Sequence, residues 1–75
     1  MATAFVLINA EKGEEGAVHA KLKDIPEVKE AYLVHGVYNI VARVQTGSMQ
    51  ELNDVIGTRI RRLEKVSSTL TTLVV

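Results

Sequence analysis

The sequence predicts an α+β fold with the element order β-α-β-β-α-β. Three observations indicate it: apolar runs rich in β-formers, two segments with helical spacing of apolar residues, and a glycine turn between the two middle runs. Right-handed crossovers through the two helices place the first and third strands at the centre of a four-stranded antiparallel sheet, with both helices on one face. This is the ferredoxin-like arrangement.

The first strand is predicted over residues 3–10, Thr-Ala-Phe-Val-Leu-Ile-Asn-Ala. It lacks apolar/polar alternation, as is typical of a strand buried on both faces. Helical spacing begins at Glu14, and Pro26 disfavours the α conformation at the residue before it, so this helix is expected to end near Lys23 or Asp24. The residues that can share its apolar face are Ala17, Val18, Ala20, Leu22 and Ile25.

Two strands are predicted around Gly36, over residues 27–34 and 38–45. Glycine is the residue that enters φ > 0 without steric cost, so Gly36 is interpreted as a hairpin turn. In the strand that follows, one side is expected to carry Tyr38, Ile40, Ala42 and Val44, and the other Asn39, Val41 and Arg43.

The second helix is predicted to begin at Ser48, because Ser48-Met-Gln-Glu51 fits a capping box. Gly57 inside it costs about 1 kcal/mol relative to alanine, and a close approach of another backbone is the explanation we consider. Residues 66–75 form the last predicted strand. The apolar stripe of the helix consists of Met49, Leu52, Val55, Ile56, Ile60 and Leu63.

The composition bounds the kind of protein. With 75 residues, the chain forms one domain, residues 1–75, and its lack of cysteine excludes disulfides and thiolate metal sites. The separation of His19 and His35 gives no local metal motif, so neither a metal nor a cofactor is expected. Nine basic residues balance nine acidic ones, which argues against capture of nucleic acid by charge. The apolar start is too short to span a bilayer, so we expect a cytoplasmic protein.

Oligomerisation is the expected source of additional stability. A chain this short buries a modest fraction of its surface and usually needs further stabilisation from disulfides, a metal or partner chains. Because the helices cover one face of the predicted sheet, the apolar residues of the other face require a second sheet. The sequence therefore predicts a homodimer in which two sheets pack face to face as a barrel-like sandwich.

Three segments resemble a known family: Ile25-Pro-Glu-Val28, Tyr32-Leu-Val-His-Gly-Val-Tyr-Asn39 and Leu63-Glu-Lys-Val-Ser-Ser-Thr-Leu-Thr-Thr72. In order and spacing they are similar to the ligand-binding half, or RAM domain, of Lrp/AsnC-type transcription regulators, and the resemblance runs from Thr3 to Val75. It implies an amino-acid effector-binding and oligomerisation module. Its dimers associate further and bind a free amino acid between them.

The resemblance also implies a ligand site at the turn, where the family typically has Gly-x-Tyr-Asp. Gly36 and Tyr38 match this motif, whereas Asn39 replaces a carboxylate, which attracts an ammonium group by charge, with an amide, which offers dipoles only. Lys65 stands where the family commonly has glycine. The candidate ligand-binding residues are His35, Gly36, Val37, Tyr38 and Asn39, with Thr71 and Leu73 from the fourth strand of an adjacent subunit.

The regulators of this family carry a helix-turn-helix domain before the first strand, whereas this chain begins at that strand. It therefore resembles the stand-alone RAM proteins, which implies no direct contact with nucleic acid. Co-assembly with a helix-turn-helix-bearing paralogue is the expected route to transcription regulation. The basic residues Arg59, Arg61, Arg62 and Lys65 are interpreted as a solvated helix end.

Two other functions remain open from the sequence. One is a ligand-blind structural or interaction module, which the change at Asn39 favours. The other is a small dimeric-barrel enzyme with His35 and Tyr38 as acid and base, although no oriented nucleophile, metal set or cofactor loop accompanies them. An ACT domain has the same strand order but lacks the glycine-tyrosine turn. We interpret His19 as a surface residue and Met49 as core.

Overall fold

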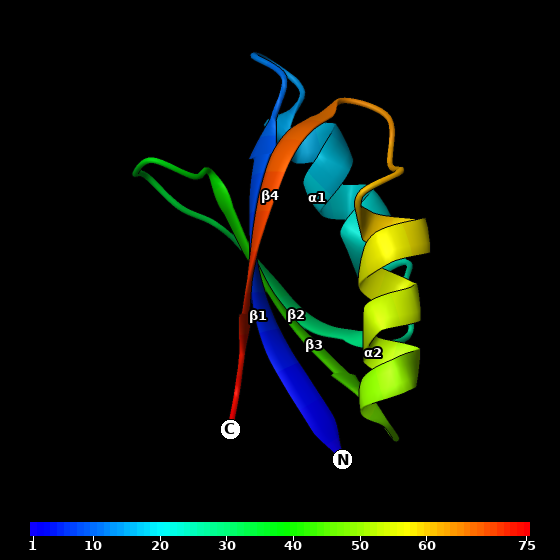
Figure 1. Cartoon of the computed structure of the whole chain (residues 1–75). Helices are drawn as coiled ribbons and strands as arrows, with labels where there is room; N and C mark the ends of the chain where they lie inside the picture. The colour runs from blue at the N-terminus through cyan, green and yellow to red at the C-terminus, as the bar shows by residue number, and fades with distance from the viewer.

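The computed structural model describes all 75 residues, and it has the predicted β-α-β-β-α-β order (Figure 1). The second helix continues directly into one π-helical turn, η1. Neither helix is long and apolar enough to cross a membrane. The elements are β1 (Ala2–Ala10), α1 (Glu15–Lys23), β2 (Val28–Leu33), β3 (Ile40–Thr46), α2 (Met49–Val55), η1 (Ile56–Ile60) and β4 (Val66–Leu73).

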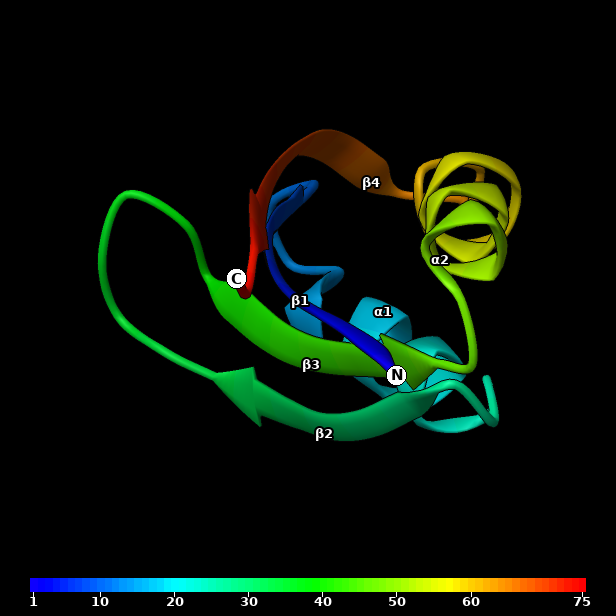
Figure 2. The same ribbon diagram turned by 60° about the horizontal axis from the view of Figure 1, so that its bottom comes forward.

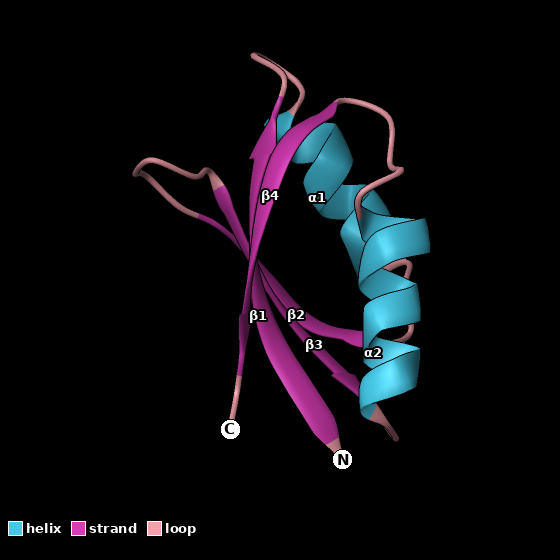
Figure 3. Ribbon diagram, in the orientation of Figure 1, coloured by secondary structure: helices cyan, strands magenta, loops and turns pink.

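The four strands form one antiparallel sheet in the order β2-β3-β1-β4, so the predicted central positions of β1 and β3 are confirmed. Both helices cover the same face, and the molecule has one layer of strands and one of helices (Figure 3). Strands β2 and β4 form the two edges. The connection between β2 and β3 projects on the side of the protein opposite to α2 (Figure 2).

The core lies between the sheet and the helices, and it is entirely one-sided. Every second residue of β1 and β3 is buried there, as strand geometry requires. The residues between them, such as Phe5 with 41% exposure, lie on the other face, so β1 is not buried on both faces within one chain. The main core residues are Ala4, Val6, Ile8, Val18, Leu22, Ile40, Ala42, Val44, Leu52, Val55, Ile56 and Ile60.

Helix α1 is less amphipathic than its sequence suggested. Val18 and Leu22 are buried, whereas Ala17 and Ala20 are exposed, because the helix contacts the sheet along a narrow stripe. His19 is not a free surface residue: its ring is half-buried, and Nε2 lies 2.7 Å from the carbonyl oxygen of Ala31 in β2. This bond ties α1 to the edge strand.

The second helix begins as predicted. The Glu51 backbone N–H donates to the Ser48 hydroxyl oxygen over 3.2 Å, which satisfies one of the unpaired donors of the first turn. Met49 is 45% exposed rather than core, since it lies in the first turn beyond the edge of the packed stripe. The helical segment ends at Ile60, and Leu63 packs against the core from the turn that follows.

The turn between β2 and β3 is longer than predicted. β3 begins at Ile40, so Tyr38 lies in the loop and not in the strand. Gly36 does not adopt a positive φ, and a Cβ atom there would meet only the Tyr38 carbonyl oxygen, at 3.7 Å. The interpretation of Gly36 as a steric necessity was therefore wrong. Because Gly36 has no side chain, it leaves the backbone of the loop uncovered.

Two other residues do adopt positive φ. Gly13 has φ 84° in the β1–α1 turn, and glycine adopts this conformation without steric cost. Lys65 has φ 73° before β4, where its Cβ atom makes the conformation unfavourable. The Lys65 carbonyl accepts a hydrogen bond from the Glu11 backbone N–H over 2.7 Å. This bond fixes the chain direction at the helix exit, so Lys65 holds a conformation that suits glycine.

Replacing Lys65 with glycine is expected to stabilise the protein. Lys65→Gly removes the steric cost of the left-handed conformation, with a partial offset from the greater freedom of the unfolded chain, for a net gain of about 1 kcal/mol in unfolding free energy. Urea denaturation measures it. Lys65→Ala is the control, since it removes the side chain but keeps the strain, and equal stability of the two variants would contradict the interpretation.

Candidate ligand-binding site

The loop from Val34 to Asn39, here called the hairpin loop, stands outside the core. The Val34 backbone N–H donates to the Asn39 carbonyl over 3.0 Å, which closes the base of the loop. His35, Gly36 and Val37 are exposed, Val37 by 87%. The loop therefore presents an imidazole and a bare stretch of backbone to solvent.

Two asparagines attach the hairpin loop to the end of β1. The Asn9 side-chain amide donates to the Val37 carbonyl over 3.0 Å, and the Ala10 backbone N–H donates to Asn39 Oδ1 over 3.1 Å. Ala10 needs this partner because the β1–β3 pairing ends at Ile8 opposite Ile40, so no strand residue of β3 faces its N–H. Asn39 therefore has a structural role, which any side chain with a carbonyl or carboxylate oxygen at this place can serve.

A hollow of about 280 Å³ lies beneath the hairpin loop. The loop contributes His35 and Asn39 to it, and helix α1 contributes Glu15, the one acidic residue in the lining. Glu15 Oε2 accepts a hydrogen bond from the Gly13 backbone N–H over 3.3 Å, which leaves its other oxygen free. Apolar side chains complete the lining: Leu33 from the end of β2 and Val34 from the start of the loop.

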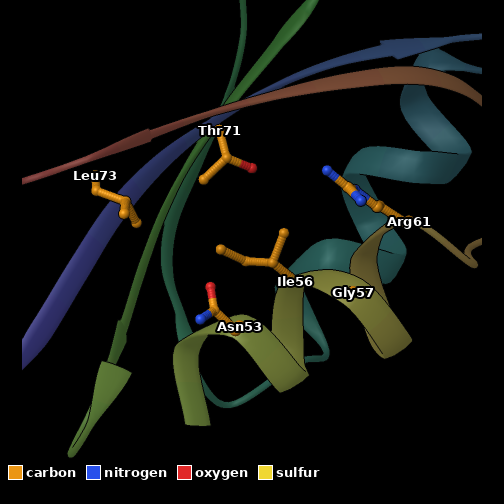
Figure 4. A pocket seen from close by; sticks show the side chains of 6 residues that line it. All are labelled: Asn53, Ile56, Gly57, Arg61, Thr71 and Leu73. Atoms are coloured by element: carbon orange, nitrogen blue, oxygen red, sulfur yellow. The ribbon is translucent and has the colours of Figure 1, made fainter. Parts of the chain in front are cut away.

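A larger hollow of about 410 Å³ lies between β4 and the α2–η1 segment, and we call it the β4 pocket (Figure 4). Thr71 and Leu73 line it from the strand, and the Thr71 hydroxyl is buried without a hydrogen-bond partner. The helical side contributes Asn53, Ile56, Gly57 and Arg61.

The predicted ligand-binding residues thus fall into two groups that one chain does not bring together. His35 and Asn39 line the hollow at the hairpin loop, which follows edge strand β2, whereas Thr71 and Leu73 line the β4 pocket at the other edge of the sheet. Only contact between copies can join them. No group of three or more histidine, aspartate or glutamate side chains is placed to hold a metal ion.

A family model described as the Lrp/AsnC ligand binding domain matches residues 3–75. The chain belongs to the Lrp/AsnC ligand-binding domain family. The HTH-type transcriptional regulator FL11 of Pyrococcus furiosus is 35% identical over 71 residues, which are 95% of this chain and 46% of the regulator. The chain therefore spans less than half of that relative.

Solved structures of this family have the same fold. FFRP-DM1 is 37% identical, with a TM-score of 0.96 and full coverage of both chains. The feast or famine regulatory protein Rv3291c of Mycobacterium tuberculosis, complexed with L-methionine, is 31% identical with a TM-score of 0.83, over 99% of this chain and 50% of that one.

A homocitrate synthase of Sulfurisphaera tokodaii is 45% identical over 58 residues, only 12% of that enzyme.

This Lrp/AsnC domain leaves the helix-free face of its sheet open. Apolar side chains gather there from all four strands, and a patch of this kind marks an interaction surface. Phe5, Tyr32 and Leu70 are 41%, 54% and 48% exposed. The open face, as we name it, consists of Phe5, Leu7, Tyr32, Val41 and Leu70.

A polar cluster lies beside the apolar part of the open face. Arg43 Nε donates to Glu30 Oε1 over 2.6 Å, and the Tyr32 hydroxyl donates to Glu30 Oε2 over 3.1 Å. The hydrogen bond from Arg43, followed by that from Tyr32, lowers the pKa of the Glu30 carboxyl. The hydrogen bond that Tyr32 donates to Glu30 raises the pKa of the Tyr32 phenol.

Sequence reasoning missed the charged residues of both hollows. Glu15 is the first residue of α1, where acidic residues suit the helix dipole, and Arg61 belongs to the basic residues interpreted above as a solvated helix end. Asn53 and Gly57 lie on the helical surface with no local signal for a pocket. Their proximity to other pocket residues depends on how helices cross the sheet, which periodicity does not report.

The Glu30 cluster predicts how stability depends on acid. Because the folded-state pKa of Glu30 is lowered, its stabilisation is present above the unfolded-state pKa and is lost as the pH falls through the folded value. Glu30→Gln should therefore lose less unfolding free energy than the wild type between about pH 6 and about pH 3. Urea denaturation across this range measures the slopes. An equally steep loss in Glu30→Gln would contradict the prediction; Glu64→Gln, an exposed carboxylate without an ion pair, should keep the wild-type slope.

Proposed function

We propose that this protein is an amino-acid effector-binding and assembly module. Its open faces pack against each other to form dimers, and the dimers associate further with a free amino acid bound between them. The site combines His35, Gly36, Val37, Tyr38 and Asn39 of one subunit with the strand residues Thr71 and Leu73 of an adjacent one. The observation that carries the proposal is the hairpin loop, which offers exposed backbone and polar groups outside the core.

Glu15 supplies the charge that the turn itself lacks. Asn39 offers the ligand no net charge, and its side-chain oxygen already accepts from Ala10. The Glu15 carboxylate lies in the same hollow and has a free oxygen, so it is placed to pair with an α-ammonium group. The loss of the family carboxylate therefore does not remove the means of capturing an amino acid.

Further assembly follows from the placement of the two hollows. The hairpin loop follows one edge strand, β2, and the β4 pocket lies at the other edge of the sheet, so each subunit presents a loop to one neighbour and a pocket to another. Contacts of this head-to-tail kind close into rings when the rotation allows. An amino acid in the contact shifts the assembly equilibrium by its different affinity for the associated and free forms.

Regulation of transcription is the proposed cellular role. Full-length Lrp/AsnC relatives are transcription regulators, such as FL11 of Pyrococcus furiosus. We propose that the module acts in the cytoplasm by co-assembly with a paralogue that carries a helix-turn-helix. No nucleophile with an oriented base supports an enzymatic role.

Amino acids are expected to change the mass of the assembly. Light scattering of the wild type should give a mass above that of a dimer, and one or a few of the twenty amino acids at millimolar concentration should shift it. Gly36→Val should abolish the shift without unfolding the chain, because Gly36 has ordinary φ and open surroundings. Gly36→Ala is the milder control. A constant mass with every amino acid would favour a ligand-blind structural module, and a monomer would refute the packing of open faces.

Removing the Glu15 charge should weaken binding. In Glu15→Gln the dissociation constant of the bound amino acid, measured by calorimetry, is expected to rise about tenfold, the equivalent of about 1.4 kcal/mol, because an ion pair to the ammonium group is lost. Glu14→Gln removes the neighbouring charge, which does not line the hollow, and should bind like the wild type. Equal affinities for both variants would rule out Glu15 as the ammonium partner.

A further inference from the structure

The helical wall of the β4 pocket has two features, a glycine and a π turn, that a helix with a purely structural role would not need. Gly57 has ordinary φ, and no atom lies within 4 Å of the place where its Cβ would be, so neither backbone conformation nor close approach requires glycine. The helix is also widened into a π turn there, with the Arg61 backbone N–H donating to the Ile56 carbonyl over 3.1 Å. Such turns are frequent at functional sites.

The polar groups of the pocket lack partners of their own. The Thr71 hydroxyl is buried and unpaired, and buried hydroxyls normally find a hydrogen bond. Arg61 belongs to neither ion pair of the protein, which join Arg43 to Glu30 and Arg59 to Glu27. Figure 4 shows the Thr71 hydroxyl and the Arg61 guanidinium pointing into the same space, opposite the Asn53 amide.

We propose that the β4 pocket binds the α-carboxylate of the effector, with Arg61 as its ion-pair partner. A guanidinium pairs with a carboxylate through two parallel hydrogen bonds, and the Thr71 hydroxyl can donate a third. This rests on the proposed function and assigns a partner to each of the two charged groups on the α-carbon of the amino acid. Arg61 of one chain takes the carboxylate, and Glu15 at the hairpin loop of a neighbour takes the ammonium group.

The lining also restricts the side chain of the effector. Ile56 and Leu73 form apolar walls, and no acidic residue is present to pair with a second positive charge. The pocket therefore favours amino acids with apolar side chains over lysine and arginine. Its volume of about 410 Å³ is within the range of small-molecule sites.

Binding to three forms of the chain tests the assignment. The wild type, Arg61→Gln and Arg62→Gln are titrated by calorimetry with L-methionine and the other amino acids, and with 3-(methylthio)propylamine, which is methionine without its carboxylate. Arg61→Gln should weaken the bound amino acid at least tenfold. Arg62→Gln removes an exposed neighbour that does not line the pocket and should bind like the wild type. The amine should bind the wild type and Arg61→Gln equally weakly.

The outcomes separate this inference from the proposed function. If the wild type binds an amino acid and Arg61→Gln binds it equally well, the carboxylate assignment is wrong and the effector module stands. If the wild type binds none of the twenty, both are wrong. Gly57→Leu is an independent check: it fills the pocket at a helical position, so it should abolish binding while the circular dichroism of the folded chain is kept. Wild-type affinity in Gly57→Leu would also refute the assignment.

Discussion

The covering of the sheet on one face only is the constraint on which the rest of this structure depends. Both crossovers are right-handed, so α1 and α2 lie on the same face and bury every second residue of β1 and β3. The remaining apolar side chains, Phe5 and Leu70 among them, have no cover within the chain. A small domain with one face of its sheet uncovered can bury more apolar surface by association, and this is the basis of the proposed dimer.

In the proposed assembly, the two hollows serve one ligand. The hollow at the hairpin loop carries a carboxylate, Glu15, and the β4 pocket carries a guanidinium, Arg61. A free amino acid has the complementary charges, an ammonium group and a carboxylate, on its α-carbon. Because the hollows lie at different edges of the sheet, a ligand that uses both must lie between copies, and its binding is then linked to assembly by differential affinity.

Several residues depart from what stability alone would select. Gly57 weakens a helix and the Thr71 hydroxyl is buried without a partner, and both line the β4 pocket. Lys65 holds a left-handed conformation outside either hollow, with the Glu11 hydrogen bond as the structural reason for that conformation. Departures that gather around one cavity indicate function, whereas nothing in the structure gives Lys65 a role beyond the turn.

The sequence by itself determined the element order and the central strands, because hydrophobic periodicity and the handedness of crossovers are local rules. The family followed from the resemblance of three of its segments. The sequence also located the hairpin loop, while mistaking the reason for Gly36. Only the tertiary structure decided that Glu15 lines the same hollow as Asn39, that Arg61 and Thr71 point into one pocket, and that the two hollows lie at different edges of the sheet. Periodicity reports which face a residue occupies, but the distance between side chains on different elements depends on how a helix crosses a twisted sheet.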